Sequence, residues 1–159
     1  MGKNKNNRPK QQMSPSMRRE PVAGAEVSRK KRPISTPARD DGDANLVFGL
    51  QLLDHDGPYA WAGISSEHTK LIAEACRGWE SMRPEEVFAA GGNKPIPFER
   101  LCPTAQARLR QIDLEEYDGL WELRVSAKRR IWGIRKRHVF YIVWWDPEHE
   151  VCPSSRRHT

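Results

Sequence analysis

The sequence predicts one α+β domain over residues 46–159, preceded by a disordered basic arm over residues 1–45. All Phe, Tyr and Trp residues lie in the second part, whereas the first part holds 5 of the 12 prolines. Apolar residues recur at helical spacing early in the domain and with a period of two after residue 119. The expected domain is a leading strand and two helices, packed on one sheet face, followed by an antiparallel β-meander.

The predicted arm lacks the apolar side chains that a core requires. It carries 11 basic and 5 acidic residues, including the run Arg29-Lys30-Lys31-Arg32. Ordering its backbone costs roughly 1–2 kcal/mol per residue, which so little apolar surface does not offset. Three interpretations are open: an arm that contacts phosphates non-specifically, a solubilising extension, or sequence upstream of a later start at Met13 or Met17.

The domain is predicted to begin with a buried strand and an amphipathic helix. Residues 46–53 form an apolar run, and turn-forming residues follow at 54–58. The serine pair at 65–66 suits a helix N-cap, and the helical pattern continues to about Met82. A second, shorter helix is expected at 84–90, because a proline opens it and a glycine pair follows it.

The rest of the domain is predicted to be a loop and then strands. Residues 91–103 contain three prolines and are expected to form a loop, with a helical turn or two around 104–112. From Gly119, apolar and polar residues alternate as in a strand with one solvated face. Trp121, Leu123 and Val125 form its apolar side, and Glu122, Arg124 and Ser126 form its polar side.

Three more segments complete the expected meander. A strand is predicted at 130–134, and the charged residues 135–138 form a hairpin tip. Residues 139–145 are apolar on both faces, so this strand should be central and covered on both sides. A short last strand is expected at 150–152.

Charge and apolar content exclude several classes of protein. The net charge of +6 divides into +6 for residues 1–45, −5 for 46–120 and +5 for 121–159. No apolar run approaches the roughly 18 residues of a membrane span, and the N-terminus lacks the apolar stretch of a secretory signal. Three widely spaced cysteines argue against a disulfide framework. We therefore expect a protein of the reducing cytoplasm with no membrane partner.

Metal and thiol chemistry have little support in the sequence. His149 and Cys152 are spaced like half a zinc site, which Cys102 or His158 would complete. Structural zinc sites usually show two close ligand pairs, so we favour no metal and no cofactor. Cys76 lies on the apolar side of the first predicted helix and is interpreted as a small core residue.

Basic side chains gather in the last third of the chain. Arg124 lies on the polar side of its strand and Arg130 begins the next one, so the two guanidiniums should converge on one sheet face. Arg156, Arg157 and His158 follow the meander. Such a cluster of forked donors suits a phosphate backbone, although charged strand residues are also commonly only a solvated surface.

The segment GLWELRVSAKRRIWGIRKRHVFYIVWW, with SSRRHT after it, resembles the C-terminal half of the RelE/ParE toxin superfamily, notably its YoeB-like and HigB-like branches. The likeness rests on Gly119-Leu120-Trp121, the Leu123-Arg124 step, Arg130 before an apolar strand, and Arg156-Arg157-His158. It implies a small β-α-α-β-β-β fold. It also implies a type II toxin that cleaves mRNA without a metal, on or off the ribosome, and a cognate antitoxin as partner.

The resemblance also implies roles for individual residues. Arg124 and Arg130 would hold the phosphate, and His158 would be the general acid, for which an ordinary pKa of about 6.5 is suitable. The chain has Thr159 where YoeB-like chains end in Tyr, which removes any role for a terminal ring.

The general base and the RNA contacts follow less directly. The glutamate base of YoeB-like chains falls on Gln111, so Glu115 or Glu116, or else Asp113, would replace it. Trp132, Trp144 and Trp145 either stack on bases or belong to the core, and Trp145, at a strand end, is the best candidate for stacking. The expected RNA-binding residues are Lys128, Arg129, Trp145, Arg156 and Arg157.

Two other functions remain open. The same basic face could hold a nucleic acid or an acidic partner without cleaving it, since some superfamily branches lack nuclease activity. Alternatively, the acidic middle of one copy binds the basic arm of another.

Overall fold

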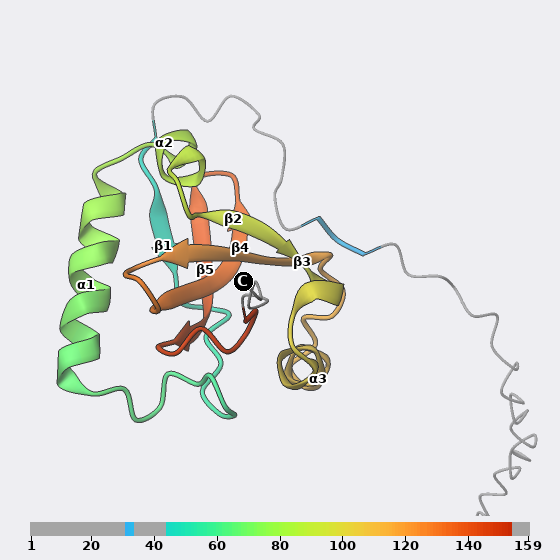
Figure 1. Ribbon diagram of the computed structural model, residues 1–159. Coiled ribbons are helices and arrows are strands. Elements are labelled where there is room, and N and C mark those ends of the chain that lie inside the picture. The colour runs from blue at the N-terminus through green and yellow to red at the C-terminus, as the bar shows by residue number, and fades with distance from the viewer. Residues whose placement is uncertain (1–30, 34–43, 154–159) are drawn as a thin grey trace, which may run out of the picture.

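The computed structural model describes residues 31–33 and 44–153, which form a mixed α+β structure with one five-stranded sheet (Figure 1). The predicted α+β class is confirmed. The elements are β1 (Val47–Gly49), α1 (Ser66–Glu80), α2 (Pro84–Ala89), β2 (Lys94–Pro97), the 3-10 turn η1 (Phe98–Arg100), α3 (Pro103–Gln111), β3 (Gly119–Arg124), β4 (Arg130–Lys136) and β5 (Val139–Asp146). Within these residues, no helix is both long enough and apolar enough to cross a membrane.

The strands lie in the order β1-β5-β4-β3-β2. Strands β2 to β5 form an antiparallel meander, and β1 pairs in parallel with β5. The segment that contains α1 and α2 connects β1 at one edge of the sheet to β2 at the other. Strand β5 therefore lies inside the sheet between β1 and β4, as its apolar sequence predicts.

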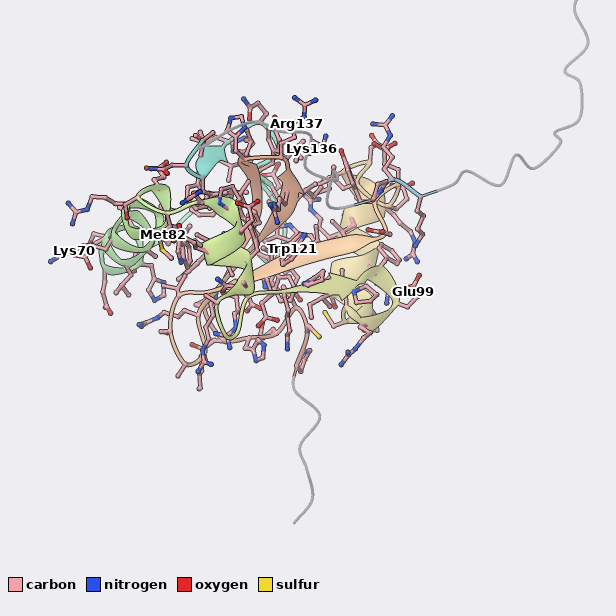
Figure 2. The ribbon with its side chains drawn as sticks, turned by 90° about the horizontal axis from the view of Figure 1, so that it is seen from above. Lys70, Met82, Glu99, Trp121, Lys136 and Arg137 are labelled. Atoms are coloured by element: carbon pink, nitrogen blue, oxygen red, sulfur yellow. The ribbon has the colours of Figure 1, made fainter. Side chains whose placement is uncertain are left out.

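Helices cover both faces of the sheet, so the expectation of helices on one face is wrong. Phe88 of α2 packs on Trp121 and on Phe140, with ring centroids 4.7 and 5.9 Å apart. Helix α3 and residues 50–64 lie on the other face, where Tyr59 contacts Trp144 at 5.2 Å (Figure 1). Seen from above, Trp121 lies inside the molecule, while Lys70 and Glu99 mark its two sides (Figure 2).

The two predicted helices form where their capping residues indicate. The Ser65 hydroxyl accepts a hydrogen bond from His68 N at 3.2 Å at the start of α1. Helix α1 ends at Glu80, two residues before the predicted end. Pro84 occupies the first turn of α2, and the Glu86 carboxylate accepts from Arg83 N at 2.7 Å.

Several strand predictions differ from the structure, including β4, which continues through residues 135 and 136 of the predicted hairpin tip. Only Val47–Gly49 of the run 46–53 pairs as a strand, because the chain then turns and Asp54 N donates to Val143 O. The predicted loop 91–103 contains β2, whose two prolines are tolerated at the sheet edge. Residues 150–152 form no strand, because the Asp146 carboxylate accepts from two backbone amides of this segment.

Most of the predicted arm lies outside the described residues, namely 1–30 and 34–43. The described residues of the arm are 31–33 and 44–45, and Arg32 pairs with Tyr117 as an isolated bridge. Residues 154–159, which include Arg156, Arg157 and His158, also lie outside the described residues.

Candidate nucleic-acid interface

The predicted arginine pair lies at the turn between β3 and β4. The strand register makes Arg124 and Arg130 direct cross-strand partners. Opposite residues in an antiparallel pair project to the same face, so the two side chains share a face, as their spacing predicts. Residues 125–129 reverse the chain between them, closed by the bond from Val125 N to Arg129 O.

Arg130 is directed at the protein and not at solvent. Its residue surface is 6% exposed, and Nε donates to Glu122 Oε1 at 2.8 Å. Nη1 donates to the carbonyls of Ser126 and Arg129 and Nη2 to that of Ala127, at 2.6, 3.0 and 3.2 Å. These four bonds occupy most of the guanidinium donors, so Arg130 supports the turn from inside.

Glu122 departs from the predicted solvated face of its strand. It is 3% exposed, because the segment after β5 folds back over this end of the sheet. His149 belongs to that segment, and its Nε2 lies 3.8 Å from Glu122 Oε1. His149 has a φ of +63°, an uncommon backbone conformation for a residue with a side chain. The sequence considered His149 only as half of a zinc site, and it predicted no role for Glu122 beyond a place on the solvated face of its strand.

Arg124, in contrast, is exposed. Its backbone N–H donates to Asn93 Oδ1 at 2.8 Å, and its Nε reaches Ser126 O at 3.4 Å. Its aliphatic chain lies against Gly92, where an added Cβ would come within 2.8 Å of Arg124 Cδ. The connection between α2 and β2 therefore positions Arg124, and none of the described carboxylates forms an ion pair with it.

Two further cations occupy the same turn. Lys128 Nζ lies 3.4 Å from Glu148, and Arg129 Nη2 lies 3.6 Å from Glu67. The carboxylate partners are both well exposed. Exposed pairs contribute only about 0–1 kcal/mol, so a phosphate can compete for either cation.

The tryptophans considered for base stacking are buried. Trp132 and Trp144 are core residues, and Trp145 is 3% exposed. The Trp145 indole N–H donates to His68 Nδ1 at 3.3 Å. Trp145 also lines a pocket of about 320 Å³ together with Pro147 and the start of α1. The Trp145 ring therefore packs on α1, one of the two roles that the sequence left open, and the preferred prediction that it stacks on bases is wrong because the ring is buried.

The candidate bases lie at the other end of β3. Glu115 and Glu116 precede Gly119, whereas Arg124 ends the strand. Five residue steps of about 3.4 Å separate the strand ends by roughly 17 Å. Glu116 also pairs with Arg32 at 3.2 Å. The structure therefore does not bring these glutamates to the arginines.

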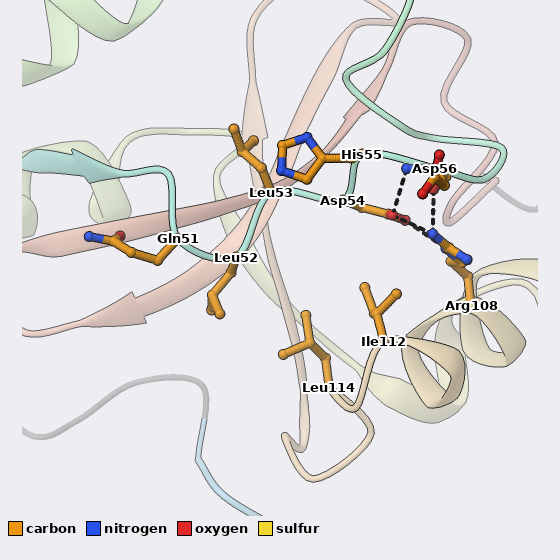
Figure 3. Close-up of a pocket in the computed structure, with 9 residues that line it drawn as sticks. All are labelled: Gln51, Leu52, Leu53, Asp54, His55, Asp56, Arg108, Ile112 and Leu114. Carbon is orange, nitrogen blue, oxygen red and sulfur yellow. Dashed lines mark hydrogen bonds and ion pairs between the residues drawn. The ribbon is translucent and has the colours of Figure 1, made fainter.

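A second polar group, absent from the sequence predictions, lies beside a pocket of about 290 Å³ (Figure 3). The Asp54 carboxylate accepts from Arg108 Nη2 and Nε at 2.6 and 2.8 Å and from Trp144 Nε1 at 2.9 Å. Burial acts to raise the pKa of Asp54, but the hydrogen bonds from Arg108 and Trp144 outweigh it and lower the pKa below 3.8. This ion pair ties residues 54–56 to α3 and β5.

Neither the surroundings of Cys76 and Cys102 nor the grouping of potential metal ligands indicates thiol or metal chemistry among the described residues. Cys76 is half-buried against the core, and burial, assisted by Glu80, raises its pKa to about 12. Cys102 caps α3, its Sγ accepting from Ala105 N and lying 3.2 Å from the Tyr59 hydroxyl. Among the described residues, no three His, Cys, Asp or Glu side chains are placed to hold a metal ion.

Comparison with protein-family models, with curated proteins and with solved structures found no match to this chain. Around β3, the chain carries cations at one end of the strand and acidic side chains at the other.

Proposed function

We propose that this chain is a RelE-like protein that binds RNA through the surface of the β3–β4 turn, formed by Arg124, Lys128 and Arg129. The observation that carries the proposal is the exposed Arg124 side chain: Asn93 Oδ1 accepts from its backbone N–H, and its guanidinium forms no ion pair with any described carboxylate. Two cations held only by exposed pairs flank it. Three cations on one short turn provide the positive charge that binding to a nucleic-acid backbone requires.

The order of the elements supports the RelE-like arrangement. A leading strand and two helices precede an antiparallel meander, as the resemblance implies, but this meander has four strands instead of three, and η1 and α3 lie between its first two strands. The Arg124 step and Arg130 occur at the β3–β4 turn of that meander.

The binding proposal is tested by substituting the two cross-strand arginines one at a time. Arg124→Ala should weaken binding to a fluorescent single-stranded RNA about fivefold, the loss of one exposed phosphate contact of about 1 kcal/mol. Fluorescence anisotropy measures the affinity. Lys70→Ala, which removes an exposed cation from α1, is the matched control and should leave the affinity unchanged.

Arg130→Met should behave differently from Arg124→Ala. Removing Arg130 leaves the buried Glu122 carboxylate unpaired, which should cost about 3 kcal/mol of folding free energy in urea unfolding. Arg124→Ala should cost little stability. Unchanged RNA affinity in Arg124→Ala would reject the turn as the binding surface.

A second candidate function is metal-independent endoribonuclease activity, as in a type II toxin. It is favoured by the half-buried His149 imidazole, which lies beside the Glu122–Arg130 pair at the end of the sheet that also carries Arg124. Cleavage needs a base for the 2′-hydroxyl, a cation for the phosphorane and an acid for the leaving 5′-oxygen. His149 would serve as the base or as the general acid, and the resemblance gives the role of general acid to His158.

Cleavage and toxicity have separate readouts. His149→Gln and His158→Gln should each be assayed for 2′,3′-cyclic phosphate products and for RNA affinity. Loss of product with unchanged affinity identifies the proton-transfer residue. If the wild-type chain yields no such product and does not arrest bacterial growth, the nuclease candidate is rejected. A cognate antitoxin would then be unnecessary, and the binding function would remain.

A further inference from the structure

The segment just before β3 holds part of the basic arm. Arg32 N–H donates to Glu116 O, and Asp118 N–H donates to Arg32 O at 2.9 Å. Asp118 O accepts from Phe98 N at 2.9 Å. The N–H and C=O of one extended residue point to the same side, so the two bonds of Asp118 place Arg32 and Phe98 on the same side of the segment before β3. The arm therefore lies along the sheet edge next to β2, where the chain has turned into η1.

The basic side chains of the arm are opposite in charge to the acidic side chains of this edge. Lys31 Nζ lies 3.3 Å from Glu99 Oε1 and 4.1 Å from the centre of the Phe98 ring. Arg32 Nη1 lies 3.2 Å from Glu116 Oε1. Two ion pairs and a cation–π contact thus accompany two backbone bonds over three residues.

We propose that the acidic edge, comprising Phe98, Glu99 and residues 116–118, is a docking site for a basic extended segment, occupied by residues 31–33 of the same chain. The proposal concerns the opposite end of β3 from the nucleic-acid interface, and it does not depend on RNA binding. It gives Lys31 and Arg32, the last two residues of the basic run 29–32, a defined protein partner.

Strand addition explains why the edge needs an occupant. An open edge leaves backbone donors and acceptors available for pairing with other chains. Residue 32 supplies one backbone donor and one backbone acceptor to this edge. The side chains then select a basic segment over a neutral one.

The length of the connecting segment favours the chain's own arm. Residues 34–43 span up to about 35 Å when extended, which is comparable to the width of a domain of this size. A short linker also gives an effective concentration in the millimolar range, well above that of a second copy in dilute solution.

Amide hydrogen exchange of the full chain tests the docking. In the wild type, the amides of Arg32 and Asp118 should be protected, and protection should not vary with protein concentration. Glu99→Lys combined with Glu116→Lys should lower this protection about fivefold, through loss of two exposed ion pairs. Adding Lys31→Glu and Arg32→Glu should restore it by reversing both pairs.

Two controls keep the test specific. Glu115→Lys makes the same charge change at the exposed neighbouring carboxylate and should leave protection unchanged. Arg32→Pro removes the arm's backbone donor without touching the domain and should release Asp118. Equal protection in the wild type and the double variant would overturn the proposal. Protection that rises with protein concentration would overturn occupation by the same chain.

Discussion

Four buried charged side chains form hydrogen bonds and ion pairs that fix loops and turns to the sheet. Asp54, Glu122, Arg130 and Asp146 are the buried charged side chains among the described residues. Each meets partners that compensate its burial: Arg108 for Asp54, Arg130 for Glu122, and Trp132 with two backbone amides for Asp146. A buried charge is tolerated only when paired and hydrogen-bonded in this way.

The Asp54–Arg108 pair gives a stability prediction with a defined pH dependence. Asp54→Asn should lower the free energy of unfolding by about 3 kcal/mol at pH 7, because it leaves the partly buried Arg108 without its anion. The pKa of Asp54 is lowered in the folded state, so its stabilisation is complete above pH 3.8 and is lost as the pH falls through the folded pKa. Urea unfolding at several pH values measures this. A difference between variant and wild type that does not shrink at low pH would contradict the assignment.

At the scale of elements, the pairing of β4 with β5 requires a close approach of the two backbones. The register shifts between Trp132 and Gly133, so that one residue of β5 is left over as a bulge. A Cβ at position 133 would overlap the Tyr141 carbonyl and come within 2.7 Å of the Phe140 ring. Only glycine fits where the central strand passes the bulge.

Two glycine-to-alanine substitutions should therefore have opposite effects. Gly133→Ala should destabilise the fold by roughly 1–3 kcal/mol through overpacking. Gly78→Ala, in the last turn of α1 with no atom within 4 Å of its added Cβ, should stabilise it by roughly 0.5–1 kcal/mol. Thermal unfolding measures the stability of both variants. If Gly133→Ala left the stability unchanged, β4 and β5 would be able to move apart at this point without loss of folding free energy.

At the scale of the whole molecule, charge is divided between the two ends of β3. Exposed cations surround the β3–β4 turn, whereas Glu99 and Glu116 at the other end bind the cations of the arm. The net charge of +6 is thus less informative than its distribution, because the arm's charge is partly neutralised on the domain itself.

The proposed interface predicts the salt dependence of RNA binding. If Arg124, Lys128 and Arg129 each contact one phosphate, the logarithm of affinity should fall with the logarithm of salt concentration with a slope of about −2. Each single alanine variant should reduce that slope by about 0.7. Anisotropy titrations over a range of salt concentrations measure it, and a slope that Arg124→Ala leaves unaltered would argue against a phosphate contact there.

Local patterns in the sequence predicted the helices, the meander and the shared face of Arg124 and Arg130. These features depend on periodicity and capping, which neighbouring residues determine. Strand β2 was missed because its prolines are typical of loops and become acceptable only at a sheet edge.

The sequence by itself determined which residues of this protein are able to form helices and strands, and where its cations are concentrated along the chain. Only the tertiary structure decided what those cations do: it buried Arg130 against Glu122, left Arg124 exposed, and placed Lys31 and Arg32 on the acidic edge. The physical reason is that an arginine's role depends on which carboxylates and carbonyls meet it. Those partners come from segments distant in the chain, such as Glu116 for Arg32, or from the chain reversal at 125–129 for Arg130.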